Sequence, residues 1–155
     1  MNEIESKIRF DRGPAKWLTW LLALTGCGLM VATVPVFFPV SVIETLHGWL
    51  GLGEFPDSAI AIYLARSCSM LYAVHGCLML IVAMDMRRYW PLVRVFGWLH
   101  VVIGLTVFGI DWTTPMPRYW IAGEGIPIAM AGVAIVWLWR KSMANAVELA
   151  TTNSE

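Results

Sequence analysis

The chain has 155 residues, of which 58% are hydrophobic and 14% are charged, and its formal net charge is zero. Soluble domains are about 45–50% apolar and about 25% charged, so this composition excludes an ordinary soluble enzyme. Basic and acidic residues number 11 each, which leaves no net positive field to attract a nucleic acid. The class that remains is a polytopic membrane protein surrounded by the lipid bilayer.

Four long apolar stretches predict four membrane-spanning helices. The stretches are residues 17–34, 59–84, 92–110 and 121–139. Together they contain only three charged residues, which are Arg66, Arg94 and Glu124. A spanning helix needs about 20 apolar residues, and a helix satisfies its own backbone amides in lipid. We therefore predict an all-α, four-helix membrane domain over residues 17–141, between cytoplasmic tails at 1–16 and 142–155, with the chain poorly ordered from Asn145 onward.

The basic residues predict the orientation of these spans. Nine of them fall on the same side, namely Lys7, Arg9, Arg12, Lys16, Arg87, Arg88, Arg94, Arg140 and Lys141. Cytoplasmic loops carry an excess of Lys and Arg, so both termini are expected in the cytoplasm. Tryptophans near both ends of the spans fit the two membrane interfaces.

The segment between the first two spans predicts a short helix over residues 41–50 in the outer headgroup layer. Pro35 and Pro39 are expected to end the first span, and Ser41 and Glu44 have the spacing of a capping box. The apolar residues of this segment fall on one helical face, as in helices that lie in a membrane interface. His47 lies on the opposite face and is expected to be solvated. Two roles remain open for this helix: a packing lid and a substrate gate.

Ionisable residues inside spans are costly and need a partner or a function. Antiparallel spans two and three are joined by a turn near Arg88, which places Arg66 level with Asp111 near the outer surface. Glu124 enters the fourth span at a similar depth, and Arg118 precedes it. We expect Arg66, Asp111, Glu124 and Arg118 to form an outer-leaflet charge cluster. The cluster is either a structural ion-pair network or an acid–base site in which one carboxyl keeps its proton.

Two histidines are expected at the middle of the membrane. The same register places His75 level with His100, and Tyr72 shares the His75 side of span two. Two facing imidazoles can ligate a b-type haem. Two histidines alone do not complete a zinc site, so no metal is predicted. The alternative is that each histidine hydrogen-bonds to a neighbouring side chain or backbone carbonyl.

Motifs of soluble enzymes are absent, including the Walker loop, the dinucleotide-binding glycine pattern and the zinc-protease motif. This absence favours a non-enzymatic membrane protein with a structural, interaction or accessory role and no cofactor, acting with a membrane-protein partner or as a homo-oligomer. Two alternatives stay open. One is an enzyme or carrier for a hydrophobic small molecule or lipid that uses Glu124 and Arg66, with Tyr72 lining the pocket. The other is a small haem protein with His75 and His100 as ligands.

Short stretches of the chain resemble small four-span bacterial membrane proteins of unassigned function. They are Tyr63-Leu-Ala-Arg66-Ser, Tyr72-Ala-Val-His75-Gly, Arg88-Tyr-Trp-Pro91, Gly109-Ile-Asp111 and Gly123-Glu124-Gly125. The similarity runs from about Phe37 to Trp139. It implies a bacterial inner-membrane location and transfers no activity.

Overall fold

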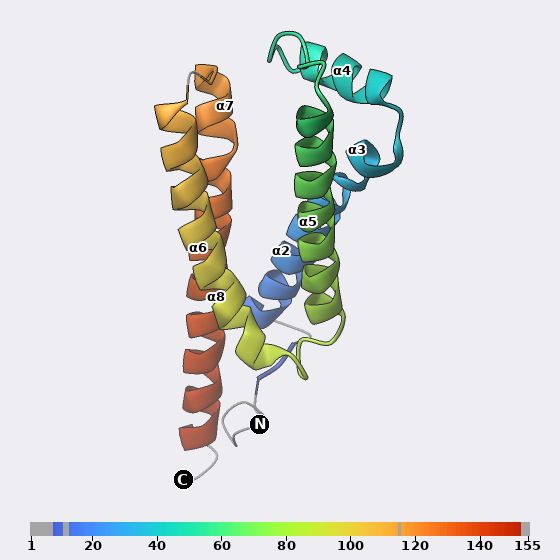
Figure 1. Cartoon of the computed structure of the whole chain (residues 1–155). Coiled ribbons are helices and arrows are strands. Elements are labelled where there is room, and N and C mark those ends of the chain that lie inside the picture. Colours follow the sequence, from blue (N-terminus) through green and yellow to red (C-terminus); the bar gives the residue numbers. More distant parts are fainter. Residues whose placement is uncertain (1–7, 11–12, 115, 153–155) are drawn as a thin grey trace. The chain divides into compact units, whose positions relative to one another are not determined.

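The computed structural model describes residues 8–10, 13–114 and 116–152, and its regular elements are all helices (Figure 1). They are α2 (Gly13–Met30), α3 (Thr33–Phe37), α4 (Val40–Trp49), α5 (Ala59–Met84), α6 (Trp90–Thr113), α7 (Arg118–Gly123) and α8 (Gly125–Thr152). Four stretches are long and apolar enough to cross a membrane, namely Gly13–Phe37, Ala59–Met84, Trp90–Thr113 and Arg118–Thr152. The predicted all-α fold with four spans and a short helix between the first two is confirmed.

The chain divides into two compact units. One, called here the α6–α8 unit, consists of the chain up to Leu22 together with the chain from Val82 onward. The other, called here the α3–α5 unit, is Ala23–Ile81.

The first span does not continue as one helix to Val34. Helix α2 ends at Met30 and the short helix α3 begins at Thr33. Pro35 has no N–H to donate to the carbonyl of Val31 and its ring crowds that carbonyl, so the regular ladder stops one turn earlier. The backbone here uses tighter bonds, including Val34 N–H to the carbonyl of Val31 at 3.1 Å. We predicted that the first helix would end at Val34, directly before Pro35. It ends earlier because a proline disrupts the turn that precedes it.

Helix α4 matches the predicted interfacial helix, but its start differs. Pro39 occupies the N-cap position and no side chain caps the helix, so the predicted capping box of Ser41 and Glu44 is wrong. His47 is also not simply solvated. Its Nδ1 lies 3.0 Å from the carbonyl oxygen of Gly53, and its ring meets that of Phe55 edge-on at 5.4 Å. These contacts fold the following loop back onto the end of α4.

In the α3–α5 unit, α2 and α5 approach closely at a pair of glycines. A Cβ on Gly76 would lie 2.8 Å from the carbonyl oxygen of Gly26, and a Cβ on Gly26 would lie 2.9 Å from Cγ of Leu80. Small residues allow spanning helices to come this close, so that dispersion contacts form between backbones. At its other end, α5 begins where the Ser58 hydroxyl accepts the N–H of Ala61 at 3.2 Å.

In the α6–α8 unit, helices α6 and α8 are antiparallel neighbours that meet backbone to backbone (Figure 1). Four glycines make this contact, and they are called here the glycine seam: Gly97 and Gly104 on α6, and Gly125 and Gly132 on α8. A Cβ on Gly125 would lie 2.5 Å from the amide nitrogen of Phe108, and a Cβ on Gly132 would lie equally close to the amide of Val101. The glycines of each helix are seven residues apart, which is about two turns, so one stripe of each helix faces the other.

An aromatic cluster closes the opposite end of this unit. Trp90 is 1% exposed, stacks on Trp139 at 6.2 Å and meets Phe10 edge-on at 5.5 Å. Its indole N–H donates to the sulfur of Met143 at 3.3 Å. Helix α8 also continues to Thr152, beyond the predicted end of order at Asn145. Ala146 remains buried there, so the helix keeps one packed face where the sequence suggested a polar tail.

Candidate functional site

A buried carboxylate lies at the α7 end of the glycine seam. Asp111 is only 6% exposed and shares the buried stripe of α6 with Gly104 and His100. Within the part of the chain that the structure describes, no hydrogen-bond partner reaches its Oδ2 atom. An ionisable group buried with an unpartnered oxygen is costly, so such a group is usually kept for a function rather than for stability.

Glu124 lies at a break in the fourth span. Helix α7 ends at Gly123, α8 starts at Gly125, and Glu124 between them has φ −107° and ψ −74°. Pro127 explains the break, because it cannot donate to the carbonyl of Gly123 and its ring crowds that oxygen. Glu124 is half-buried and has an interaction partner, so it is not a free carboxylate. Broken spanning helices expose backbone polar groups and commonly mark binding sites in membrane proteins.

The constant register of the seam places these two acids at one end of the unit. Gly104 faces Ala129 and Gly125 faces Phe108, so Asp111 lies three residues, about 4.5 Å, beyond the last contact of the seam toward α7. Glu124 directly precedes Gly125 and therefore also lies at this end. Arg118 starts α7 in the same unit. The structure therefore brings three of the predicted cluster residues to the α7 end.

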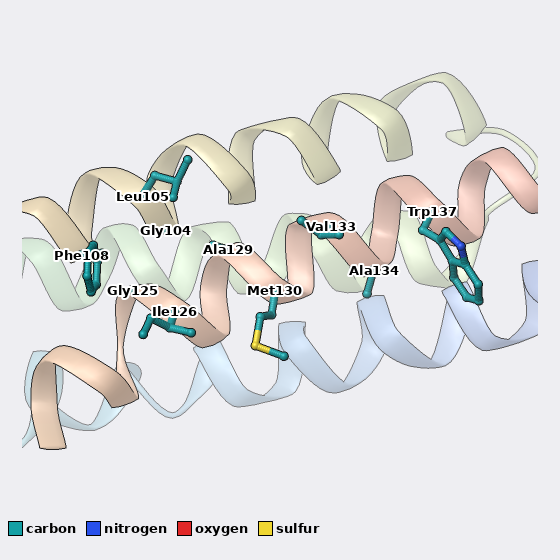
Figure 2. Close-up of a pocket in the computed structure, with 10 residues that line it drawn as sticks. All are labelled: Gly104, Leu105, Phe108, Gly125, Ile126, Ala129, Met130, Val133, Ala134 and Trp137. Carbon is teal, nitrogen blue, oxygen red and sulfur yellow. The ribbon is translucent and has the colours of Figure 1, made fainter.

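A groove of about 500 Å³ runs along α6 and α8 and stops at this end. Figure 2 shows Phe108, Gly125 and Ile126 at one end of the groove and Trp137 at the other. Every residue that lines it is apolar: Gly104, Leu105, Phe108, Gly125, Ile126, Ala129, Met130, Val133, Ala134 and Trp137. Pockets for small molecules have volumes of roughly 300–1,000 Å³ and are mostly apolar, so the groove has the size and surface of a site for one hydrophobic ligand.

This groove was not predicted from the sequence, although the sequence contains a signal for it. Span four carries small residues at Gly125, Ala129 and Gly132, a pattern that allows a neighbouring helix to approach closely. Close approach of two backbones leaves the larger side chains to form walls beside the contact. Phe108 and Trp137 are two such large residues, and they lie at opposite ends of the groove.

The other predicted residues fall in the α3–α5 unit. Arg66 donates from Nη2 to the carbonyl oxygen of Phe38 at 3.1 Å, which ties α5 to the end of α3. Tyr72 and His75 follow on the same helix. Because these three residues and Asp111 belong to different units, the pairing of Arg66 with Asp111 stays a prediction.

The pairing of His75 with His100 also stays a prediction. His100 is 3% exposed, and its Nδ1 lies 2.8 Å from the carbonyl oxygen of Phe96, one turn earlier on α6. His75 lies in the other unit, so haem ligation by the two remains a prediction. A Soret absorbance in protein purified from haem-replete cells tests it. Among the described residues, no group of three or more His, Cys, Asp and Glu side chains is arranged to hold a metal.

The fold and the site together define a multi-pass helical membrane protein with a buried carboxylate at the end of an apolar groove. Comparison of the chain with protein-family models, curated proteins and solved structures finds no match. What the protein does must therefore be argued from its geometry.

Proposed function

We propose that the protein is a non-enzymatic integral membrane protein that binds one hydrophobic, lipid-like molecule in the groove between α6 and α8. The observation that carries this proposal is the groove of about 500 Å³ with an entirely apolar lining. The lining combines small residues such as Gly104 and Ala129 with large ones such as Phe108, and none of its side chains is polar. Met130 and Trp137, which also line the groove, are 66% and 53% exposed.

The ligand gains affinity because the side chains of the groove pack against it more closely than the surrounding lipid chains do. In lipid there is no hydrophobic force between helix and acyl chain, so dispersion contacts decide the affinity. A flat helix surface offers few such contacts, whereas a groove surrounds a chain on three sides. Binding of this kind is saturable, and that property separates it from contact with bulk lipid.

Photolabelling in non-ionic detergent micelles tests the proposal. The probe is a long-chain alkane that carries a diazirine, and the labelled residues are identified by mass spectrometry. We expect saturable labelling of the groove at one probe per chain. Ala134→Phe fills the groove and should abolish the labelling, whereas Ala131→Phe, on the same helix but outside the lining, should not. Labelling that never saturates, or saturable labelling confined to residues outside the groove, contradicts the proposal.

We also propose a bacterial inner-membrane location with both termini in the cytoplasm. The basic residues that flank the spans support this orientation through the positive-inside rule. Reporter fusions after Thr152 and within the loop at Gly53 test it. The cytoplasmic reporter should be active only at the first position, and the reverse pattern excludes the orientation.

A second candidate function is an enzyme or carrier for a hydrophobic molecule, with Glu124 as its working group. The break at Glu124 favours it, because Gly125 and Ile126, the next two residues, line the groove. Movement of a fluorescent lipid across reconstituted vesicles tests the carrier. Glu124→Gln should slow this movement without loss of alkane labelling, whereas Glu44→Gln, a matched change on exposed α4, should not. Equal rates in wild type and Glu124→Gln exclude the carrier.

A further inference from the structure

We propose that the molecule held in the groove carries a positively charged ammonium group, which pairs with Asp111. This inference rests on the proposed function and names the chemical class of the ligand. Asp111 is 6% exposed, and within the described chain its Oδ2 has no hydrogen-bond partner. A buried carboxylate oxygen that lacks a donor can accept a strong, charge-assisted hydrogen bond from a cationic group.

The position of Asp111 relative to the groove suits a ligand with a polar head and an apolar tail. On α6, Asp111 follows Phe108 by three residues, which is a rise of about 4.5 Å. Phe108 and Gly125 form the end of the groove nearest to α7. A chain that lies in the groove therefore brings its head group within about one helical turn of the carboxylate.

The charges at the two ends of the groove set the direction in which the ligand lies. At the far end, the ammonium nitrogen of Lys141 lies 4.1 Å from the ring centre of Trp137, which lines the groove. Arg94 lies over the neighbouring Trp139 at 5.4 Å. The far end is thus cationic, whereas the α7 end holds two acids, Asp111 and Glu124, against one base, the exposed Arg118. An ammonium head is attracted to Asp111 and repelled from Lys141, whereas a carboxylate or phosphate head has the opposite preference.

Other partners fit Asp111 less well. A metal ion needs several oxygen or nitrogen ligands, and no group of three or more suitable side chains is gathered among the described residues. A hydroxyl head group can donate one hydrogen bond but leaves the negative charge of the carboxylate uncompensated. An ammonium group supplies both the donor and the charge, and this pairing is strong where water is excluded.

Competition against the alkane photoprobe tests the inference with three ligands of equal chain length: dodecylamine, dodecanol and dodecanoic acid. In wild-type protein we expect the amine to displace the probe at about tenfold lower concentration than the other two, the advantage that one charged hydrogen bond provides. Asp111→Asn should remove this advantage and leave the probe labelling intact. Asp57→Asn, the same change on an exposed loop residue, should preserve it.

A measurement on the wild-type protein keeps the test decisive even if the Asp111 variant does not fold. An amine probe with its diazirine beside the nitrogen should label α6 near Phe108, and one with its diazirine at the tail should label α8 near Trp137. The reverse pattern overturns the inference, as does equal competition by all three ligands. Equal competition by amine and alcohol alone assigns a hydroxyl donor and also overturns it. If the alkane probe itself never labels saturably, the proposed function fails instead.

Discussion

The glycine seam makes one prediction that depends only on backbone geometry. Replacing Gly104 with alanine places a Cβ 2.7 Å from both Cα of Ala129 and the carbonyl oxygen of Gly125 and still closer to the amide nitrogen of Ala129. All three are backbone atoms of α8, so no side chain can rotate to make room. The two helices must separate, and contacts along the seam weaken.

The size of the effect follows from two opposing contributions. Forcing an extra methyl group into a packed contact costs about 1–3 kcal/mol, and a clash with backbone belongs at the upper end of that range. Alanine is the better helix former and returns up to about 1 kcal/mol. We therefore expect Gly104→Ala to lower the free energy of unfolding by about 2 kcal/mol.

Two glycines of the same helix serve as matched controls. A Cβ on Gly109 meets nothing within 4 Å, so Gly109→Ala should be neutral or stabilising by up to about 1 kcal/mol. A Cβ on Gly97 meets first a side-chain methyl of Val136 at 2.7 Å, which can shift in part, so Gly97→Ala should fall between the other two. Unfolding by sodium dodecyl sulfate in mixed micelles, followed by circular dichroism, measures all three. If Gly104→Ala is as stable as Gly109→Ala, the two helices are not in backbone contact.

Three further changes have definite expected results. Asp111→Asn should raise the free energy of unfolding by about 1 kcal/mol, because it removes a buried ionisable group whose Oδ2 has no hydrogen-bond partner among the described residues; a fall in the same micelle assay would indicate a structural ion pair. Trp90→Ala should cost about 3–5 kcal/mol, since it empties the centre of the aromatic cluster, whereas Trp90→Phe should cost less. His47→Ala should speed hydrogen exchange in the loop around Gly53 without changing global stability, and unchanged exchange would mean that this hydrogen bond does not hold the loop.

The sequence predicted well those spans that contain no interior proline. The second predicted span and α5 have the same bounds, Ala59–Met84, because its apolar run ends at polar residues on both sides. The third span, predicted over residues 92–110, extends a few residues at each end in α6. Hydropathy determines such helices directly, since most of their residues prefer lipid and no proline interrupts the helix interior.

Hydropathy did not predict the helix breaks in the first and fourth spans. Both contain a proline close to one end, and in both the helix breaks before the proline, at Met30 and at Glu124. Hydropathy does not register these breaks, because the residues on either side are equally apolar. The break at Glu124 matters most, since it determines where the acid lies relative to the end of the groove.

The candidate site was predictable only in part. The stripe of His100, Gly104 and Asp111 follows from helical periodicity, and α6 buries all three residues. The groove depends instead on how closely α6 and α8 approach each other. That distance is determined by backbone contacts at the seam, which a pattern within one helix does not contain.

The glycine seam also bears on the order in which the protein is assembled. Its four glycines lie between Gly97 and Gly132, and the two helices are joined directly through α7. Short connections make loop closure inexpensive in entropy, so contacts local in sequence form early. During synthesis, α6 and α8 can therefore associate as a hairpin as soon as the fourth span enters the bilayer. The groove is lined by these two helices alone, so it is complete as soon as the hairpin has formed.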